Sequence, residues 1–271
     1  MTASAIQYQQ VLKNGGSIYL PPNPNFLNLS IPDLSVPDTV QLYDIGTAYV
    51  YNGKAYYYAY VTAAVEGGTA AAKSYKQEVS YQLIGATAAI YATSITITVG
   101  ATDGIAAGGV VAKDYLKGGS VQVFTGTTTQ FTRGIIGNAA VAANGGTCVI
   151  DLDGPIPAAL TTSMYAEATS SPWAAVMDST AAWMTKVGVA TCYSAASKWV
   201  WLQTWGQCWV TPQYSIGTAG YHHAIFKHDG SVEKITTVDL NHSDQYAGWS
   251  FSFGAGGAQA APFVFLMIAH P

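Results

Sequence analysis

The side chains most able to do chemistry are few and scattered along the chain. The five histidines are His222, His223, His228, His242 and His270. His222 and His223 are adjacent, so on a strand they face opposite ways and cannot simply bind one metal together. The stretches 242–244 (H-S-D) and 151–154 (D-L-D-G) offer acids or imidazoles near each other, but the second lacks the further ligands of a calcium loop. Both patterns are typical of turns. The sequence therefore predicts no metal site and no cofactor.

No nucleophile carries a recognisable activating motif. The three cysteines, Cys148, Cys192 and Cys208, are odd in number and include no C-x-x-C pair, which argues against a disulfide framework and a thiolate zinc site. We expect free, buried thiols. There is no G-x-S-x-G elbow, and the glycine loop 254–260 lacks the Lys and Ser/Thr of a phosphate-binding loop. Nothing in the sequence singles out a catalytic carboxylate pair. We predict no catalytic residues and no enzymatic activity.

Aromatic side chains are concentrated in residues 198–210 (K-W-V-W-L-Q-T-W-G-Q-C-W-V). Four of the seven tryptophans lie here, at Trp199, Trp201, Trp205 and Trp209. All four occupy odd positions, so in a regular strand they project from one face, and the opposite face is also largely apolar. Burying one tryptophan removes about 150–250 Å² of surface from water. Such a strand needs a partner, which could be the protein's own core, another subunit or a sugar.

Low charge sets this chain apart from an average soluble protein. Charged residues make up 10% of the sequence, against roughly 25% in typical soluble domains. A surface with so little charge loses the self-repulsion that keeps free proteins apart, which favours packing against copies or partners. The formal net charge of −4 offers no basic footprint, so we expect no nucleic-acid binding.

The first 45 residues differ from the remainder. Five prolines crowd this segment: Pro21, Pro22, Pro24, Pro32 and Pro37. Because proline lacks a backbone donor, the segment cannot supply central strands, and an extended arm is expected. It also carries apolar residues that need a docking surface, among them Phe26, Leu29, Ile31 and Leu34. The arm could pack over its own domain or reach a neighbouring subunit.

Short β-branched and aromatic runs, separated by glycine turns, fill the remaining chain. Residues 47–60 predict a hairpin around Asn52-Gly53, and Asp229-Gly230 marks a second hairpin. The one helix expected covers part of residues 66–79. We predict an all-β protein with two antiparallel β-sandwich or barrel units preceded by an extended proline-rich N-terminal arm. The expected divisions are an arm over 1–45, a β domain over 46–171, and a second β domain over 172–271 that contains the tryptophan-rich strand.

No stretch predicts a membrane span or an export signal. The sequence begins M-T-A-S-A-I-Q-Y-Q-Q, without a basic segment followed by an apolar one. The longest apolar run, 260–269, is about half the length needed to cross a bilayer. We expect this run to be a buried C-terminal strand in a protein that does not bind membranes.

Four stretches resemble structural proteins of tailed bacteriophages, particularly head decoration (cement) proteins. They are 42–59 (L-Y-D-I-G-T-A-Y-V-Y-N-G-K-A-Y-Y-Y-A), 94–111 (S-I-T-I-T-V-G-A-T-D-G-I-A-A-G-G-V-V), 145–163 (G-G-T-C-V-I-D-L-D-G-P-I-P-A-A-L-T-T-S) and 187–210. The W-x-x-x-Q-T-x-G pattern within the last stretch is the most specific part.

The resemblance implies a non-enzymatic virion component on the capsid surface, made in the host cytoplasm. Its implied partners are the major capsid protein and copies of itself, with a trimer as the expected oligomer. The residues expected at these interfaces are Phe26, Leu29, Ile31, Leu34, Trp199, Trp201, Trp205 and Trp209. The alternative is a tail or fibre component that binds a host-surface carbohydrate through its aromatic side chains.

Overall fold

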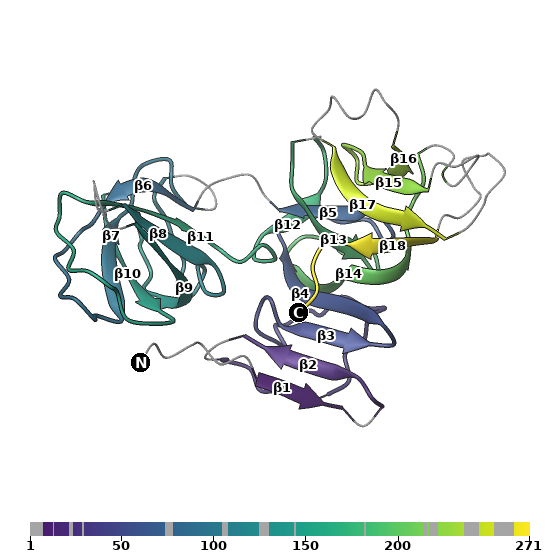
Figure 1. Cartoon of the computed structure of the whole chain (residues 1–271), viewed down its shortest axis with the longest axis horizontal. Helices are drawn as coiled ribbons and strands as arrows, with labels where there is room; N and C mark the ends of the chain where they lie inside the picture. Colours follow the sequence, from purple (N-terminus) through teal and green to yellow (C-terminus); the bar gives the residue numbers. More distant parts are fainter. Residues whose placement is uncertain are drawn as a thin grey trace. The chain divides into compact units, whose positions relative to one another are not determined.

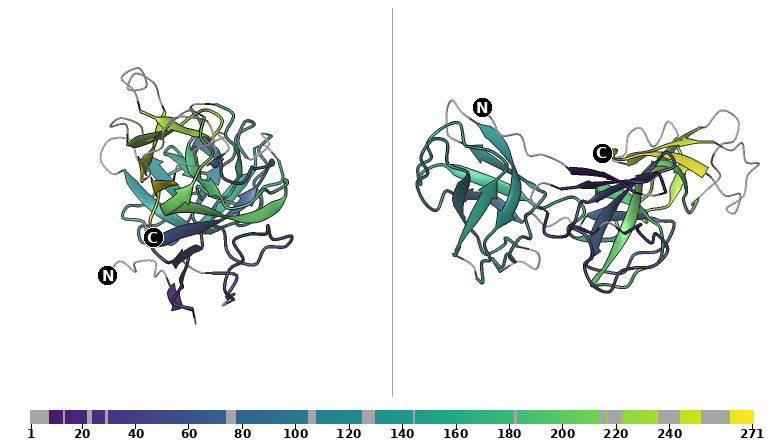
Figure 2. Two further views of the ribbon diagram at one scale, coloured as in Figure 1. Left: turned by 90° about the vertical axis from the view of Figure 1, so that its right-hand side faces the viewer. Right: turned by 90° about the horizontal axis from the view of Figure 1, so that it is seen from below.

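The computed structural model is all-β, which confirms that part of the predicted fold class (Figures 1 and 2). It describes the chain except residues 1–7, 13, 22–23, 29, 74–77, 105–107, 125–129, 144, 182, 214–215, 217–221, 236–243 and 252–262. The described residues contain eighteen strands and no helix. Within the same residues, no segment forms a helix long and apolar enough to cross a membrane.

The strands follow one another through the whole chain. The first nine are β1 (Tyr8–Val11), β2 (Ser17–Leu20), β3 (Ala48–Tyr51), β4 (Lys54–Val61), β5 (Ala70–Lys73), β6 (Val79–Leu83), β7 (Ser94–Thr98), β8 (Ser120–Phe124) and β9 (Phe131–Asn138). The others are β10 (Thr147–Leu152), β11 (Tyr165–Thr169), β12 (Val176–Asp178), β13 (Lys186–Ala190), β14 (Lys198–Trp209), β15 (His223–Phe226), β16 (Val232–Lys234), β17 (Gln245–Ser250) and β18 (Phe263–Met267).

The strands form two compact units that differ from the predicted division. The first unit is built on residues 76–171 together with Pro21 of the N-terminal segment, and the second on 8–20, 24–75 and 172–271. The predicted boundary near residue 172 coincides with a boundary between the units. Residues 46–75, however, belong with the C-terminal part of the chain, because β4 pairs with the tryptophan-rich β14 from Lys198↔Val61 to Trp205↔Ala55.

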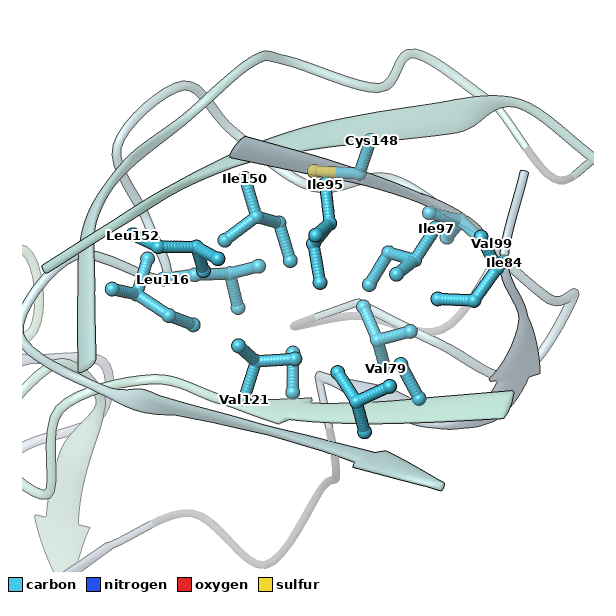
Figure 3. Packing of buried hydrophobic residues seen from close by; sticks show 14 of the residues in the cluster. Val79, Ile84, Ile95, Ile97, Val99, Leu116, Val121, Cys148, Ile150 and Leu152 are labelled. Atoms are coloured by element: carbon cyan, nitrogen blue, oxygen red, sulfur yellow. The ribbon is translucent and has the colours of Figure 1, made fainter. Parts of the chain in front are cut away.

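The first unit is a curled six-stranded antiparallel sheet in the order β6-β11-β8-β9-β10-β7. A bridge between Ile84 and Ile97 joins its two ends, so the sheet closes around a core. The side chains of β10 alternate between the core and the surface: Cys148, Ile150 and Leu152 are buried, while the residues between them are exposed. Figure 3 shows these three side chains among the branched aliphatic residues that fill the interior.

The second unit is a twelve-stranded sheet in the order β1-β2-β3-β4-β12-β5-β13-β14-β18-β17-β15-β16. An additional pairing between β4 and β14 closes the strands β4, β12, β5, β13 and β14 into a ring. Because β14 is twelve residues long, it pairs with β13 and then with β18 along one edge, and with β4 along the other. Its first part pairs with β4, and Trp205 to Trp209 pair with β18.

Local sequence signals explain the hairpins but not the expected helix. Asn52 and Gly53 join β3 to β4 with φ of 50° and 72°, as a two-residue hairpin turn of this kind requires. The predicted helix over 66–79 is wrong in its described part, since Ala70–Lys73 form β5 and Val79 begins β6. Ala70, Ala71 and Ala72 are fully buried within the sheet, and this packing overrides the helix propensity of alanine.

The described part of the N-terminal segment is not a separate extended arm. Strands β1 and β2 form a hairpin whose second strand pairs with β3. Beyond the hairpin, the Asp44 carboxylate accepts hydrogen bonds from the backbone N–H groups of Asn25 and Phe26, at 2.7 and 3.0 Å. Asp38 also exchanges two backbone hydrogen bonds with Trp199 of β14. The segment therefore packs on its own unit, one of the two arrangements considered above.

Candidate functional site: an aromatic face on the second unit

A β-bulge divides the tryptophan-rich strand β14 into two parts. Gln203 pairs with Tyr56 of β4, whereas Trp205 pairs with the adjacent Ala55. Because neighbouring residues of β4 point to opposite faces, Gln203 and Trp205 also face opposite ways. Gly206 follows with a φ of 86°. The expectation that all four tryptophans share one face is therefore wrong, since the bulge changes the phase between Trp201 and Trp205.

Before the bulge, the tryptophans pack inside the second unit. Trp201 is 2% exposed. Its ring centroid lies 5.1 Å from those of Tyr43 and Tyr58 and 6.1 Å from that of Tyr49. Trp199 is partly buried against the same cluster. These two residues, predicted at an intersubunit interface, contact their own chain instead.

The same aromatic cluster holds the proline-rich segment in place. The Tyr58 hydroxyl donates a hydrogen bond of 2.7 Å to the Asp38 carboxylate and accepts one from the Leu42 N–H. The Tyr43 hydroxyl donates to the Ser30 carbonyl. Burial raises the pKa of Tyr43 to about 12, and burial with the nearby Asp38 carboxylate raises that of Tyr58 further. Both phenols remain protonated donors at neutral pH.

After the bulge, large apolar side chains project from the outside of the sheet. Cys208, Val264 and Leu266 are buried in the core beneath. Alternation places the residues between them outside, and the pairs Trp205↔Met267 and Trp209↔Phe263 bring the two strands' outer side chains together. We call this surface the aromatic face. Its members are Trp205, Trp209, Trp249, Phe251, Phe263, Phe265 and Met267.

A second bulge brings β17 into the aromatic face. Tyr246 and Trp249 are three residues apart, yet both are exposed, while Ala247 and Ser250 are buried. The register shift opposite Ala224/Ile225 and the φ of 143° at Gly248 account for this change of phase. A Cβ at Gly248 would lie 1.7 Å from the Phe265 carbonyl oxygen, so only glycine allows β17 to approach β18 here.

The rings of the aromatic face contact one another and remain accessible. Trp249 and Phe265 stack with centroids 4.6 Å apart and an interplanar angle of 2°, and Trp205 meets Phe265 edge-on at 5.3 Å. Trp209, Trp249 and Phe263 are 41%, 38% and 43% exposed. The contacts fix the orientation of the rings without covering them. The face can therefore bind an apolar or flat partner without first ordering flexible side chains.

Polar and imidazole groups lie within and around the aromatic face. Gln207 is exposed between Trp205 and Trp209 on β14. The His270 ring contacts Trp205 edge-on at 5.2 Å. His223 Nδ1 lies 3.0 Å from the Tyr246 hydroxyl on the neighbouring β17. These groups can supply hydrogen bonds at the margin of an otherwise apolar contact.

The other residues predicted at an interface differ in their exposure and packing. Ile31 is 52% exposed, whereas Leu34 packs against the cluster around Trp201. Phe26 is half-buried, and Leu29 lies outside the described residues. Of the predicted set, Trp205 and Trp209 thus fall within the aromatic face, while Leu34, Trp199 and Trp201 line an internal cluster.

Sequence reasoning missed the members contributed by β17 and β18. The apolar run 260–269 was expected to be a buried C-terminal strand. The spacing of Phe263, Phe265 and Met267 held the missing signal: three large side chains at alternate positions share one face in a strand without a bulge, and β18 has none in its pairing with β14. The phase of Trp249 could not be read in this way, because it depends on the bulge at Gly248.

The thiols are held in their neutral form. Burial raises the pKa of Cys208 to about 12 and that of Cys148 to about 11, and it also raises the pKa of Cys192. All three cysteines are free. In the part of the chain that the structure describes, no group of three or more His, Cys, Asp or Glu side chains could hold a metal ion. His242, one of the residues weighed as a ligand, lies outside that part.

No family model, no curated protein and no solved structure matches this chain.

Proposed function

We propose that this protein is a structural component of a tailed-phage virion that decorates and stabilises the capsid. In this role the aromatic face binds the major capsid protein or a neighbouring copy. The observation that carries the proposal is the aromatic face itself, an exposed array of large rings on paired strands. Contiguous exposed apolar surfaces are uncommon on soluble monomers and generally mark contact sites.

The composition of the aromatic face suits a protein partner. Trp, Phe and Met are enriched in protein interfaces, and charged residues are depleted at their centres. The paired segments of β14 and β18, Trp205–Trp209 and Phe263–Met267, contain no charged residue. Covering this surface removes apolar area from water without desolvating a charge. Repetition around a shell would then add avidity to each modest contact.

The phage setting rests on the resemblance of four stretches to head decoration proteins, two of which form parts of the second unit described above. The hairpin within 42–59 supplies β3 and most of β4, and 187–210 supplies most of β13 and all of β14. These stretches pair with each other through β4 and β14. Segments that resemble one family and form one sheet support a shared architecture better than isolated motifs do.

The first prediction concerns Trp209 and Phe263, which are directly paired across β14 and β18. Replacing both with serine should reduce the occupancy of the protein on capsids by at least tenfold, because aromatic residues near an interface centre carry most of the binding free energy. Occupancy would be measured by quantitative gel densitometry of purified particles. Self-association would be measured by sedimentation velocity.

A matched control is Tyr193→Ser, which removes another exposed aromatic ring, 56% exposed, from the second unit. We expect this variant to bind capsids normally. Equal occupancy of the wild type and the Trp209/Phe263 double variant would refute the proposal. Saturable quenching of tryptophan fluorescence by a host polysaccharide, without capsid binding, would instead favour the tail or fibre alternative.

A further inference from the structure

Three aromatic rings form a second exposed group on the first unit, on the outer surface of β6, β11 and β8. Tyr81 and Tyr165 stack with ring centroids 4.6 Å apart and an interplanar angle of 7°. Phe124 approaches Tyr81 at 5.3 Å. Tyr165 covers one face of the Tyr81 ring, but Tyr81 is still 54% exposed, so its other face is open to solvent. We call these three residues the tyrosine platform.

The backbone at Tyr81 is unusual for a residue inside a strand. Its φ is 46°, in the left-handed region that bulky L-residues rarely adopt. The pairing of β6 with β11 shifts register between Ala166 and Ala168, opposite this position. Glycine or asparagine would relieve the strain, yet the chain places a large exposed ring here. Strained backbone clusters at functional sites, and the stacking on Tyr165 distinguishes Tyr81 from Tyr91, which has a φ of 71° in a turn.

A polar row runs beside the tyrosine platform on the same surface. Phe124 pairs with Tyr165, and two residues along the same strands Gln122 pairs with Glu167. Thr132 of β9 pairs with Gln122 and donates a hydrogen bond to its side-chain oxygen. Two residues span about 7 Å along a strand. The amide of Gln122 and the carboxylate of Glu167 therefore lie about 7 Å along the strands from the stacked rings, with the Thr132 hydroxyl beside them. A glycan could contact the rings and these polar groups at the same time.

The charged residues of this surface indicate which ligands with a flat face, charged or neutral, could bind here. Strands β6, β8 and β11 contain no lysine or arginine and one carboxylate, that of Glu167. A nucleotide or an acidic polysaccharide would meet no basic side chain on these three strands, and Arg133 of the neighbouring β9 donates its guanidinium hydrogen bonds to the Thr132 and Pro155 carbonyls. A neutral pyranose suits both the tyrosine platform and the polar row. Its C–H face packs on the electron-rich face of an aromatic ring, and its hydroxyls form hydrogen bonds with the polar groups.

We propose that the tyrosine platform binds a neutral hexopyranose glycan. The site lies on a different unit from the aromatic face, and the proposal does not depend on what covers that face. In a particle-bound protein, such a site would hold the particle to a polysaccharide surface. Many repeated copies would make weak individual binding sufficient.

The test uses the full-length protein and a panel of neutral oligosaccharides of glucose, galactose and mannose. Binding would be detected by saturation-transfer NMR and quantified by calorimetry. All seven tryptophans lie outside residues 76–171. The tyrosine platform contains no tryptophan, so binding there should quench tryptophan fluorescence less than binding at the aromatic face, which contains Trp205, Trp209 and Trp249.

The key variants are Tyr165→Ala and Tyr81→Asn. Asparagine tolerates a positive φ, so Tyr81→Asn removes the ring while relieving the backbone, and its Tm should equal or exceed that of the wild type. Each variant should weaken glycan binding about tenfold or more, as expected for an aromatic anchor. The matched control is Tyr91→Asn, which removes a tyrosine with a φ of 71° and 70% exposure from a turn of the same unit.

Results of two kinds would overturn the proposal, one from the wild-type protein and the other from the variants. One is the absence of saturable binding by the wild-type protein to every oligosaccharide in the panel. The other is an equal loss of binding in Tyr91→Asn, or loss of capsid binding rather than glycan binding in Tyr81→Asn. The Trp209/Phe263 double variant should bind the glycan normally, so failure of the capsid proposal and failure of this one are distinguishable.

Discussion

The hydrogen bond between Tyr58 and Asp38 ties the proline-rich segment to the second unit. Desolvation raises the pKa of Asp38, although the Tyr58 hydroxyl that donates to this carboxylate partly opposes the shift. The folded state therefore binds this proton more tightly than the unfolded chain does. The stabilisation from this group is complete below the usual pKa of aspartate and is lost as the pH rises through the raised folded-state value.

We predict that Asp38→Asn keeps the Tyr58 hydrogen bond and removes the desolvated charge. Its Tm should match or exceed that of the wild type at neutral pH and should lack the fall between acidic and neutral pH that Asp38 contributes. Tyr58→Phe should lower the free energy of unfolding by about 1–3 kcal/mol, because Asp38 and the Leu42 N–H both lose a partner. Thermal denaturation across a pH series measures both effects. Identical pH profiles for the wild type and Asp38→Asn would contradict this assignment.

For individual residues, the sequence showed which side chains are important but not whether each one is buried or exposed. In a regular strand Trp201 and Trp209 would project from the same face, yet Trp201 is buried and Trp209 is exposed. What separates them is the bulge between Gln203 and Trp205, which is set by the pairing with β4. Gly206 is a local signal of a bulge, but the residues between which the strand changes phase are fixed by the pairing with β4.

At the scale of elements, two glycines test how the bulges build the aromatic face. Gly248→Ala would place a Cβ against the Phe265 carbonyl, so we predict a loss of about 3 kcal/mol or more in the free energy of unfolding. Gly53 also has a positive φ, but a Cβ there meets nothing within 4 Å. Gly53→Ala should therefore cost only the conformational term of about 1–2 kcal/mol.

Chemical denaturation followed by tryptophan fluorescence would measure both glycine variants. In addition, Gly248→Ala should lose capsid binding, because Trp249 can no longer lie beside Phe265. Gly53→Ala should bind normally: although the Gly53 carbonyl lies against Gly206 of β14, the added Cβ meets nothing within 4 Å, and β3 and β4 pair with neither β17 nor β18. Equal destabilisation by the two substitutions would show that the close approach at Gly248 is unimportant.

The elements that could be predicted are those with local determinants. Asn52-Gly53 and Asp229-Gly230 each specify a hairpin within a few residues, and both hairpins are present. The alternating strand β10 likewise shows its buried face directly. The helix expected near Ala70 failed because a run of small residues is equally suited to a crowded ring of strands, and the sequence alone does not show that crowding.

At the scale of the whole molecule, one unit is inserted within the sequence of the other, whereas the prediction placed the two units one after the other. Residues 76–171 form a continuous insertion between β5 and β12, which are antiparallel neighbours in the second unit. Lys73 and Val176 are paired, so the chain leaves and re-enters that sheet at one place. Within the first unit, Val79 pairs with Ala168, and the Ser170 hydroxyl donates to the Glu78 carboxylate. The two ends of the insertion are thus held together by its own contacts.

An insertion with adjacent ends should be separable from its host, because the buried clusters of each unit are formed by residues of that unit. Replacing residues 75–171 with a short Gly/Ser linker should leave a folded second unit that retains all seven tryptophans and the aromatic face. A fragment of residues 78–171 should fold around the core of Ile95, Ile97 and Ile150. Amide NMR dispersion and cooperative thermal unfolding would establish each outcome. If either piece fails to fold, the two units depend on each other for stability, and the insertion is not an autonomous domain.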